Sequence, residues 1–389
     1  NLSWVKDDTF VDLKKIPKDD QHLIEAIYAK NQGATYKEIE ERIYPFKEIA
    51  AHLTGYIGYV NEEELQELEA DGFTANDKVG RTGLEVIFDE SLRGIPGKKV
   101  VILDKEGTEK EVLFEQETVN GESLHLTIDI DLQSKLYQQL QGEQGTAAAM
   151  NYKTGEVVAL VNSPGYDPNQ FILGISADQL SDLQEDKAKP LLNRFTQVYS
   201  PGSTLKPVTA AIALSEKSVD RNFTIDVQGL KWQKDASWGN YHVTRVTDPG
   251  VPVDMEKAMI YSDNIYFAQV ALEIGAETFI EKARDFGIGE TLPLRYGVKD
   301  SQLANGSQIT NELLLADTGF GQGEVMLNIL NLNKAYSAFV NDGNIINPRL
   351  IAGDTELDMK NIISKEVADE VFGFLLKVVE DEQGTGHDA

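Results

Sequence analysis

The chain has 389 residues and a formal net charge of −28, from 36 basic and 64 acidic side chains. A negative surplus of this size argues against nucleic acids and anionic membranes as direct partners. The sequence contains no cysteine, which excludes disulfides, thiolate zinc ligands and thiol catalysis. Its 41% hydrophobic content is typical of a globular protein, and its length predicts two or three domains.

The first 125 residues are predicted to form a region of short elements without catalytic residues. Helices are expected over residues 20–31 and 62–70, and a β-hairpin is expected to turn at Lys105–Gly107. The segment His52–Val60 alternates apolar residues with glycines, which indicates a tight strand or turn. We therefore expect a non-catalytic domain over residues 1–125.

A change of pattern near residue 125 predicts a second domain over residues 126–389. A strand is expected at Leu124–Ile128, followed by a helix that ends at Gly142. The apolar segments Thr146–Met150 and Val157–Val161 predict a buried hairpin. Further helices are predicted at residues 178–187, 329–340 and 366–379.

The segment around Ser203 carries the first candidate site. Pro201-Gly202 is a loop signal, and the apolar spacing that follows predicts a helix over 204–217, so Ser203 and Lys206 are expected one turn apart on one face. A serine hydroxyl becomes a nucleophile when a base takes its proton, and lysine can act as that base when burial or a helix N-terminus lowers its pKa. We therefore expect Lys206 to be buried. Ser-x-x-Lys pairs are common by chance, so a second element is needed to identify a site.

Ser262-Asp263-Asn264 provides that second element. Helices are predicted over 255–261 and 265–274, and the corner between them can aim Ser262 and Asn264 into a cleft. Taken alone, the tripeptide is ordinary helix-capping chemistry, with Asp263 or Asn264 as the N-cap. The presence of Ser203 and Lys206 upstream favours the catalytic interpretation.

Two loops have other interpretations. The glycine-rich stretch Asp317–Gly323 lacks the Gly-Lys-Ser/Thr of a phosphate loop, and we expect a turn that brings backbone close to another element. Trp232 and Trp238 either line a groove or pack beneath their loop, and the sequence leaves both alternatives open.

Ser-x-x-Lys followed by Ser-Asp-Asn resembles the signature of the penicillin-recognising enzymes, whose third motif is Lys-Thr-Gly. The resemblance to class B penicillin-binding proteins covers nearly the whole chain and includes Arg42–Pro45, Gly83–Glu85, Leu92–Gly94, Thr154–Glu156, Tyr166–Pro168 and Gly321–Gly323. Three segments resemble the low-affinity, methicillin-resistance-type subgroup: Trp4–Phe10, Trp232–Asp235 and Tyr241–Arg245. The implied fold is α+β, with an antiparallel sheet flanked by helices, a helical subdomain and an N-terminal α+β pedestal.

The resemblance also implies a function, a peptidoglycan D,D-transpeptidase that cross-links D-Ala-D-Ala stem peptides and is acylated by β-lactams. Ser203 would be the acylated nucleophile, Lys206 its base and Ser262 a proton relay. Substrate-binding roles are implied for Asn264, Tyr241 and Gln322. No metal or organic cofactor is implied. The implied location is the outer face of the bacterial cytoplasmic membrane, through an anchor ahead of Asn1, and the partners are stem peptides, β-lactams and other cell-wall synthesis proteins.

The third motif departs from the family pattern. The only Lys-Thr-Gly is residues 153–155, in the predicted hairpin turn upstream of Ser203, so we do not assign Lys153 to the motif. We expect the C-terminal strands of the sheet to be missing from this chain. A serine β-lactamase is a weaker alternative, because it needs a glutamate to activate water and the segment at Glu312 lacks the pattern. A β-lactam sensor or an inactive binding scaffold is the other alternative, although sensors usually lack so large a pedestal.

Overall fold

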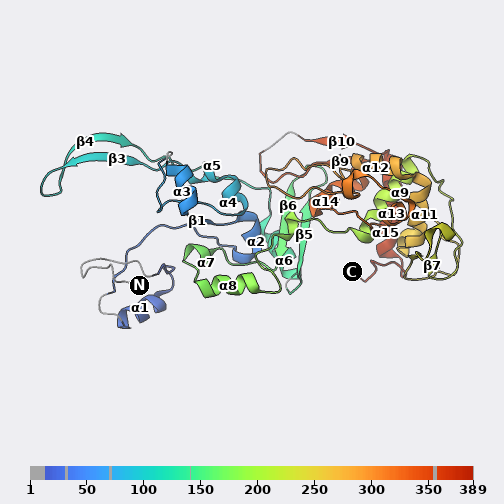
Figure 1. Cartoon of the computed structure of the whole chain (residues 1–389), viewed down its shortest axis with the longest axis horizontal. Coiled ribbons are helices and arrows are strands. Elements are labelled where there is room, and N and C mark those ends of the chain that lie inside the picture. The colour runs from blue at the N-terminus through green and yellow to red at the C-terminus, as the bar shows by residue number, and fades with distance from the viewer. Residues whose placement is uncertain (1–13, 31–33, 70–71, 141, 354–356, 389) are drawn as a thin grey trace. The chain divides into compact units, whose positions relative to one another are not determined.

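The computed structural model describes residues 14–30, 34–69, 72–140, 142–353 and 357–388, and the chain divides into two compact units (Figure 1). The first unit comprises residues 1–124, 141–144 and 163–192, and the second comprises 125–140, 145–162 and 193–389. The segment Trp4–Phe10 lies outside the described residues. Among the described residues, no helix combines the length and apolar character needed to cross a lipid bilayer.

The first unit is built from short helices and strand pairs. Its elements are α1 (Gln21–Lys30), α2 (Lys47–Thr54), β1 (Ile57–Tyr59), α3 (Glu62–Leu68), β2 (Lys78–Gly80), α4 (Gly83–Ile87), α5 (Asp89–Arg93), β3 (Lys98–Leu103), β4 (Glu109–Gln116), α7 (Asn169–Ile172) and α8 (Ala177–Glu185). Strands β3 and β4 form the predicted antiparallel hairpin, with Val100 opposite Phe114 (Figure 1).

One sequence prediction in this unit is half wrong. His52 and Leu53, expected in a strand or turn, lie in α2, and only Ile57–Tyr59 forms a strand. Helix α2 packs against α4 and buries Ala50, Ala51 and Leu53, so tertiary packing overrides the glycine-rich local pattern. Gly55 ends the helix at a φ of +74°.

Segments far apart in the sequence meet inside the first unit. The Tyr44 hydroxyl donates to Glu85 Oε1 at 3.1 Å, and Arg42 Nε lies 3.2 Å from the same oxygen. The side chain of Asn169 makes two 2.9 Å hydrogen bonds with the backbone of Tyr44. These contacts give Arg42–Pro45 and Gly83–Glu85 a structural role, because the buried Glu85 carboxylate needs polar partners.

The second unit carries most of the helices. Its elements are α6 (Ile130–Leu140), β5 (Gly145–Met150), β6 (Val157–Ser163), η2 (Arg194–Thr196), η3 (Gly202–Leu205), α9 (Lys206–Ser215), β7 (Lys231–Trp232), η4 (Ala236–Trp238), β8 (Val243–Thr244), α10 (Met255–Ile260), α11 (Asn264–Ile274), α12 (Ala276–Asp285), η5 (Asn305–Ser307), α13 (Glu312–Thr318), α14 (Ile329–Val340), β9 (Asn344–Ile346), β10 (Met359–Asn361) and α15 (Lys365–Glu380). The pair β5–β6 forms the predicted hairpin, but only β6 is largely buried, and β5 is half-buried along its length. The strand expected at Leu124–Ile128 is not formed, since Leu126 makes only an isolated antiparallel bridge to Ile351.

Helices α9 and α11 form the centre of the second unit. Helix α9 packs against α11 and α15, and α11 also packs against α13 (Figure 1). Val208, Ala210, Ala211 and Ile212 of α9 are all buried, and the alanines allow neighbouring helices to approach closely. Because α9 is buried and apolar around most of its circumference, it is a core helix.

The two tryptophans of the 231–239 loop pack on each other. Trp238 is buried, and its ring centroid lies 5.3 Å from that of Trp232 in an edge-to-face arrangement. Of the two alternatives, packing beneath the loop is the one observed. Tyr241 adds a third ring, 5.9 Å from Trp238.

Candidate active site

One turn of chain holds Ser203 and Lys206 together. Pro201 and Gly202 lead into the 3₁₀ turn η3, and Lys206 is the first residue of α9, followed by Pro207 in the favoured first-turn position. Lys206 Nζ lies 3.1 Å from Ser203 Oγ. The serine is exposed and the lysine is buried, so the hydroxyl is open to a substrate while the amine is shielded from water.

Ser262 and Asn264 come to the same point from the turn between α10 and α11. Ser262 Oγ lies 2.8 Å from both Ser203 Oγ and Lys206 Nζ, and Asn264 Oδ1 accepts a hydrogen bond from Lys206 Nζ at 2.8 Å. The carbonyl oxygen of Ser262 accepts another, at 2.6 Å. Four oxygen atoms thus surround one amine, and Ser262 Oγ bridges the nucleophile and the amine in a geometry that permits proton transfer.

Burial sets the protonation of Lys206. Its side chain is among the most buried in the chain, and desolvation lowers its pKa from 10.5 to about 7, against the opposing effect of the nearby Asp263 carboxylate. A substantial fraction of this amine is therefore neutral near neutral pH and can accept a proton from a hydroxyl. The expectation that Lys206 is buried is confirmed.

Asp263 is the N-cap of α11. Its Oδ1 accepts hydrogen bonds from the backbone N–H groups of Ile265 and Tyr266, at 2.8 and 3.2 Å. The capping interpretation therefore holds for Asp263, while its neighbours Ser262 and Asn264 face Lys206. Both interpretations of the tripeptide therefore hold: Asp263 caps the helix, and Ser262 and Asn264 contribute to the site.

The glycine-rich loop after α13 lies against the turn that bears Ser203. The backbone N–H of Gly202 donates to the carbonyl oxygen of Gly321 at 2.9 Å, and the Ser200 hydroxyl donates to the same oxygen at 2.9 Å. A Cβ on Gly321 would lie 1.8 Å from the carbonyl oxygen of Gly202, and its φ is +78°. The predicted close approach of backbone is thus confirmed, and it requires glycine.

The remaining two predicted residues lie at the margin of this group. The Tyr241 hydroxyl donates to Asp317 rather than to the four central residues, and burial raises the pKa of both groups. Gln322 follows Gly321 with an exposed side chain, and its backbone N–H donates to the Asp317 carbonyl oxygen at 2.9 Å. Glu312, the nearest approach to a β-lactamase base, pairs with Lys234 at 2.6 Å instead.

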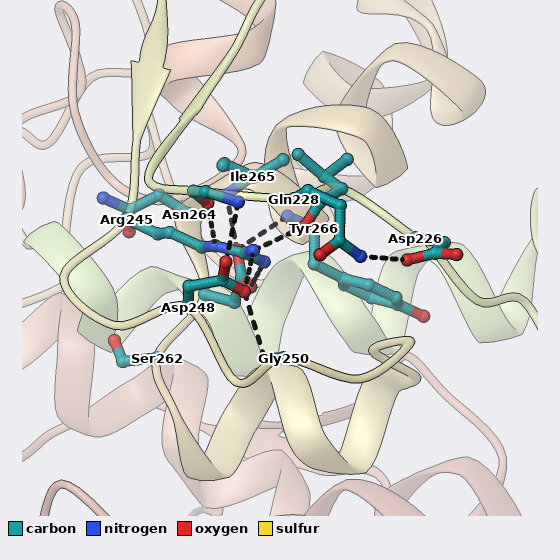
Figure 2. Close-up of polar contacts among 12 residues, drawn as sticks. Asp226, Gln228, Arg245, Asp248, Gly250, Ser262, Asn264, Ile265 and Tyr266 are labelled. Carbon is teal, nitrogen blue, oxygen red and sulfur yellow. Dashed lines mark hydrogen bonds and ion pairs between the residues drawn. The ribbon is translucent and has the colours of Figure 1, made fainter.

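Sequence reasoning did not assign a role to Arg245. Its guanidinium is buried, with Nη1 2.9 Å from Asp263 Oδ2. Figure 2 shows Arg245 beside Asp248, its other carboxylate partner. The residue belonged to the quoted segment Tyr241–Arg245, but its sequence distance from Asp263 conceals the pair. Among the described residues, no three His, Asp or Glu side chains are grouped so as to hold a metal ion.

Two family models match the chain. Residues 145–389 match the penicillin-binding protein transpeptidase domain, and residues 2–126 match the penicillin-binding protein dimerisation domain. The chain is 41% identical over 387 residues to "Penicillin-binding protein 3" of Bacillus subtilis. The alignment covers 99% of this chain and 57% of that relative. It is 30% identical over 352 residues to "Peptidoglycan D,D-transpeptidase MrdA" of Escherichia coli K12. That alignment covers 85% of this chain and 55% of the relative. The chain thus spans a little over half the length of these relatives.

Solved structures share the fold. The penicillin-binding protein PBP2 of Helicobacter pylori, from a complex with MreC, matches 96% of this chain and 70% of its own with a TM-score of 0.79 at 23% identity. PBP2 of Pseudomonas aeruginosa, in complex with WCK 5153, matches 91% of this chain and 78% of its own with a TM-score of 0.75 at 25% identity. The implied α+β transpeptidase fold is confirmed. On these matches, the chain belongs to the class B penicillin-binding proteins, in which a dimerisation domain is joined to a transpeptidase domain.

Proposed function

We propose that the protein is a peptidoglycan D,D-transpeptidase that acts through an acyl-enzyme on Ser203. The observation that carries the proposal is the buried Lys206 amine, which lies within hydrogen-bond distance of the Ser203 and Ser262 hydroxyls. The names of the relatives support the same activity.

The reaction follows from this arrangement. Ser203 Oγ attacks the carbonyl carbon of the penultimate D-Ala while its proton passes to Lys206, directly or through Ser262. The backbone N–H of Ser203 serves as one donor to the oxyanion. The C–N bond to the terminal D-Ala then breaks, and the leaving amine takes the proton. The amine of a second stem peptide then attacks the ester carbonyl and gives up a proton to the same base. The C–O bond to Ser203 breaks as the new C–N bond forms, and the base returns the proton to Ser203 Oγ.

A β-lactam undergoes only the first of these two steps, the acylation of Ser203. Attack by Ser203 opens the lactam C–N bond and leaves the drug attached as an ester. The Asn264 side chain, Tyr241 and Gln322 are the proposed substrate contacts, with Tyr241 and Gln322 on the loops around Asp317.

Intact mass after exposure to penicillin tests the proposal. The protein is expected to gain the mass of one drug molecule, on the peptide that contains Ser203. Ser203→Ala should lose the adduct, and Ser237→Ala, which alters another exposed serine of the same unit, should keep it. A single slow stoichiometric burst indicates a penicillin-binding protein, whereas continued hydrolysis would indicate a β-lactamase. Labelling elsewhere than Ser203 would overturn the assignment.

Slow acylation by penicillins is a finer element of the proposal. It rests on the resemblance of Trp232–Asp235 and Tyr241–Arg245 to the low-affinity, methicillin-resistance-type subgroup. Compared with other class B members, labelling should require longer exposure or more drug. Rapid stoichiometric labelling at low drug concentration would contradict this assignment.

The cellular setting is proposed from the family. Residues 1–125 would form a non-catalytic pedestal and residues 126–389 the transpeptidase domain, held at the outer face of the cytoplasmic membrane and working with stem peptides and other cell-wall synthesis proteins. The Helicobacter relative solved with MreC supports partners of this kind. Fractionation of cells that express the whole protein, combined with digestion by external protease, tests the location. Recovery in the cytoplasm would contradict it.

A further inference from the structure

A buried ion pair joins Arg245 to Asp263, which lies between the site residues Ser262 and Asn264 in the chain; Figure 2 shows Arg245 with Ser262 and Asn264. Arg245 Nη1 donates to Asp263 Oδ2 at 2.9 Å, and both side chains are only 1% exposed. The other two nitrogens of the guanidinium also have partners. Nη2 donates to Asp248 Oδ1 and to the Val227 carbonyl, each at 2.6 Å, and Nε donates to the Gly229 carbonyl at 3.0 Å. Each of the three nitrogens therefore has at least one partner, as a buried guanidinium requires.

Asp263 links this pair to the catalytic turn. One carboxylate oxygen caps α11 through Ile265 and Tyr266, and the other is held by Arg245. The preceding residue, Ser262, has a φ of +52°, a left-handed conformation that is unfavourable for a residue with a side chain. A conformation of this kind persists only where its surroundings hold it, and Arg245 with Asp263 provides that hold on one side.

A second connection runs through Asn264. Its Nδ2 donates to the carbonyl oxygen of Thr244 at 2.9 Å, and its Oδ1 accepts from Lys206 Nζ at 2.8 Å. Thr244 directly precedes Arg245, so the same end of β8 contacts both Asp263 and Asn264. A shift of Arg245 would therefore move the amide that contacts Lys206.

We propose that Arg245 is a positioning residue of this site: its guanidinium holds Asp263 and thereby fixes the strained turn that brings Ser262 and Asn264 to Lys206. This inference rests on the proposed acylation of Ser203. The guanidinium of Arg245 binds carboxylates and backbone carbonyls rather than Ser203 or Lys206, so its effect on the reaction passes through Asp263.

The pair also has an electrostatic consequence for Lys206. The groups facing its amine are Ser203 from η3, the three residues 262–264 of the turn, and the Phe267 ring of α11, whose centroid lies 5.8 Å from Nζ. Helices α10, α12 and α15 also pack on α9. Lys282 of α12 pairs with Glu216 just beyond the C-terminal end of α9, and Glu370 of α15 pairs with Arg221. Burial lowers the pKa of the Lys206 amine, and the Asp263 carboxylate is the charged group that opposes this effect and raises the pKa.

Arg245 offsets that charge. Without the guanidinium, Asp263 would act on Lys206 unopposed and the pKa of Lys206 would rise. The fraction of Lys206 that is neutral, and can therefore act as a base, would fall at a given pH. The rise of the acylation rate on the acid side of its pH profile, the acid limb, would then move to higher pH. A residue that only stabilised the fold would lower the amount of active protein without moving this limb.

Acylation by a fluorescent penicillin, measured across pH, tests the proposal. In Arg245→Gln, the midpoint of the acid limb is expected to rise by about one pH unit, and the plateau rate should fall. Arg245→Lys keeps the charge and loses the planar fork, so its midpoint should stay near that of the wild type while its plateau falls. Asp248→Asn is the matched control: it removes the other carboxylate on Arg245, and its midpoint should not move. An unchanged midpoint in Arg245→Gln would overturn the proposal.

A second measurement does not depend on acylation. The Cε resonance of Lys206, in protein labelled at lysine and assigned by its loss in Lys206→Met, reports the pKa of the amine directly. It should titrate at higher pH in Arg245→Gln than in the wild type, and equal titration would refute the inference. If the wild type were not acylated at Ser203, the proposed function would fail while this titration still decided the role of Arg245.

The double variant covers the case in which Arg245→Gln does not fold. Arg245→Gln with Asp263→Asn removes both charges of the pair, so no unpaired charge stays buried. The double variant should fold, with a midpoint no higher than that of the wild type and a reduced plateau because the turn is no longer held. Acylation by the double variant at the wild-type rate would show that the pair positions nothing.

Discussion

Replacing Lys206 by methionine is expected to change the pH dependence of stability. The pKa of the folded lysine is lowered by burial to about 7, whereas in the unfolded chain it keeps its ordinary value of 10.5. Between these values the unfolded state binds more protons than the folded state. The free energy of unfolding of the wild type therefore rises with pH in this window. The destabilisation caused by the buried lysine is largest below the window and disappears above it.

The size of the effect follows from that difference. At about 1.4 kcal/mol for each pH unit, the gap between 10.5 and about 7 makes the buried amine cost about 5 kcal/mol well below pH 7, and slightly less at pH 7, where about half of the folded protein already has the neutral amine. Methionine fills a similar volume without a charge, but it leaves the Ser262 carbonyl and Asn264 Oδ1 without their donor, at about 1–3 kcal/mol each. The cost of these two unpaired acceptors does not vary with pH, so it does not affect the change in relative stability between one pH and another. From pH 7 to pH 9, the stability of Lys206→Met relative to the wild type should fall by about 2 kcal/mol.

Urea unfolding at about pH 7, 8 and 9 measures this change. The fluorescence of Trp232 and Trp238 reports on the unit that contains Lys206, provided that Trp4 is replaced by phenylalanine in all variants. Lys377→Met, at an exposed position of α15, is the control and should parallel the wild type. If Lys206→Met also paralleled the wild type across pH, the conclusion that Lys206 is a largely neutral buried amine would be wrong.

Three other outcomes are expected. Wild-type acylation by penicillin should rise with pH through a midpoint near 7, because only the neutral form of Lys206 accepts a proton, and a rate that does not vary between about pH 6 and pH 8 would contradict this role. Lys206→Arg should lose acylation almost completely, since guanidinium cannot be deprotonated, and near-normal labelling would remove Lys206 as the base. Gly321→Ala should slow acylation by on the order of 100-fold, because its Cβ would displace the Gly202 carbonyl beside Ser203. Gly275→Ala, with a similar φ of +80° but open space around the added Cβ, should lose stability without that loss of rate.

Local sequence patterns determined much of this protein. Helical spacing after Pro201-Gly202 was sufficient to set Ser203 and Lys206 one turn apart, because that relation is a property of a single helical turn. The predicted helix at 329–340 agrees with α14, and the hairpin around residues 105–107 is formed as expected. The glycines near residue 321 indicated a close backbone approach, although not the element that they would meet.

Tertiary structure alone decided the chemistry of the site. Lys206 becomes a base because α9 is buried within a helical core, and the extent of that burial is the sum of contacts from many segments. The meeting of Lys206 with Ser262 and Asn264 joins positions more than fifty residues apart. The half-wrong strand at His52–Val60 and the unassigned Arg245 have the same cause. Local patterns report how a segment can fold, whereas desolvation and charge pairing depend on which distant groups surround it.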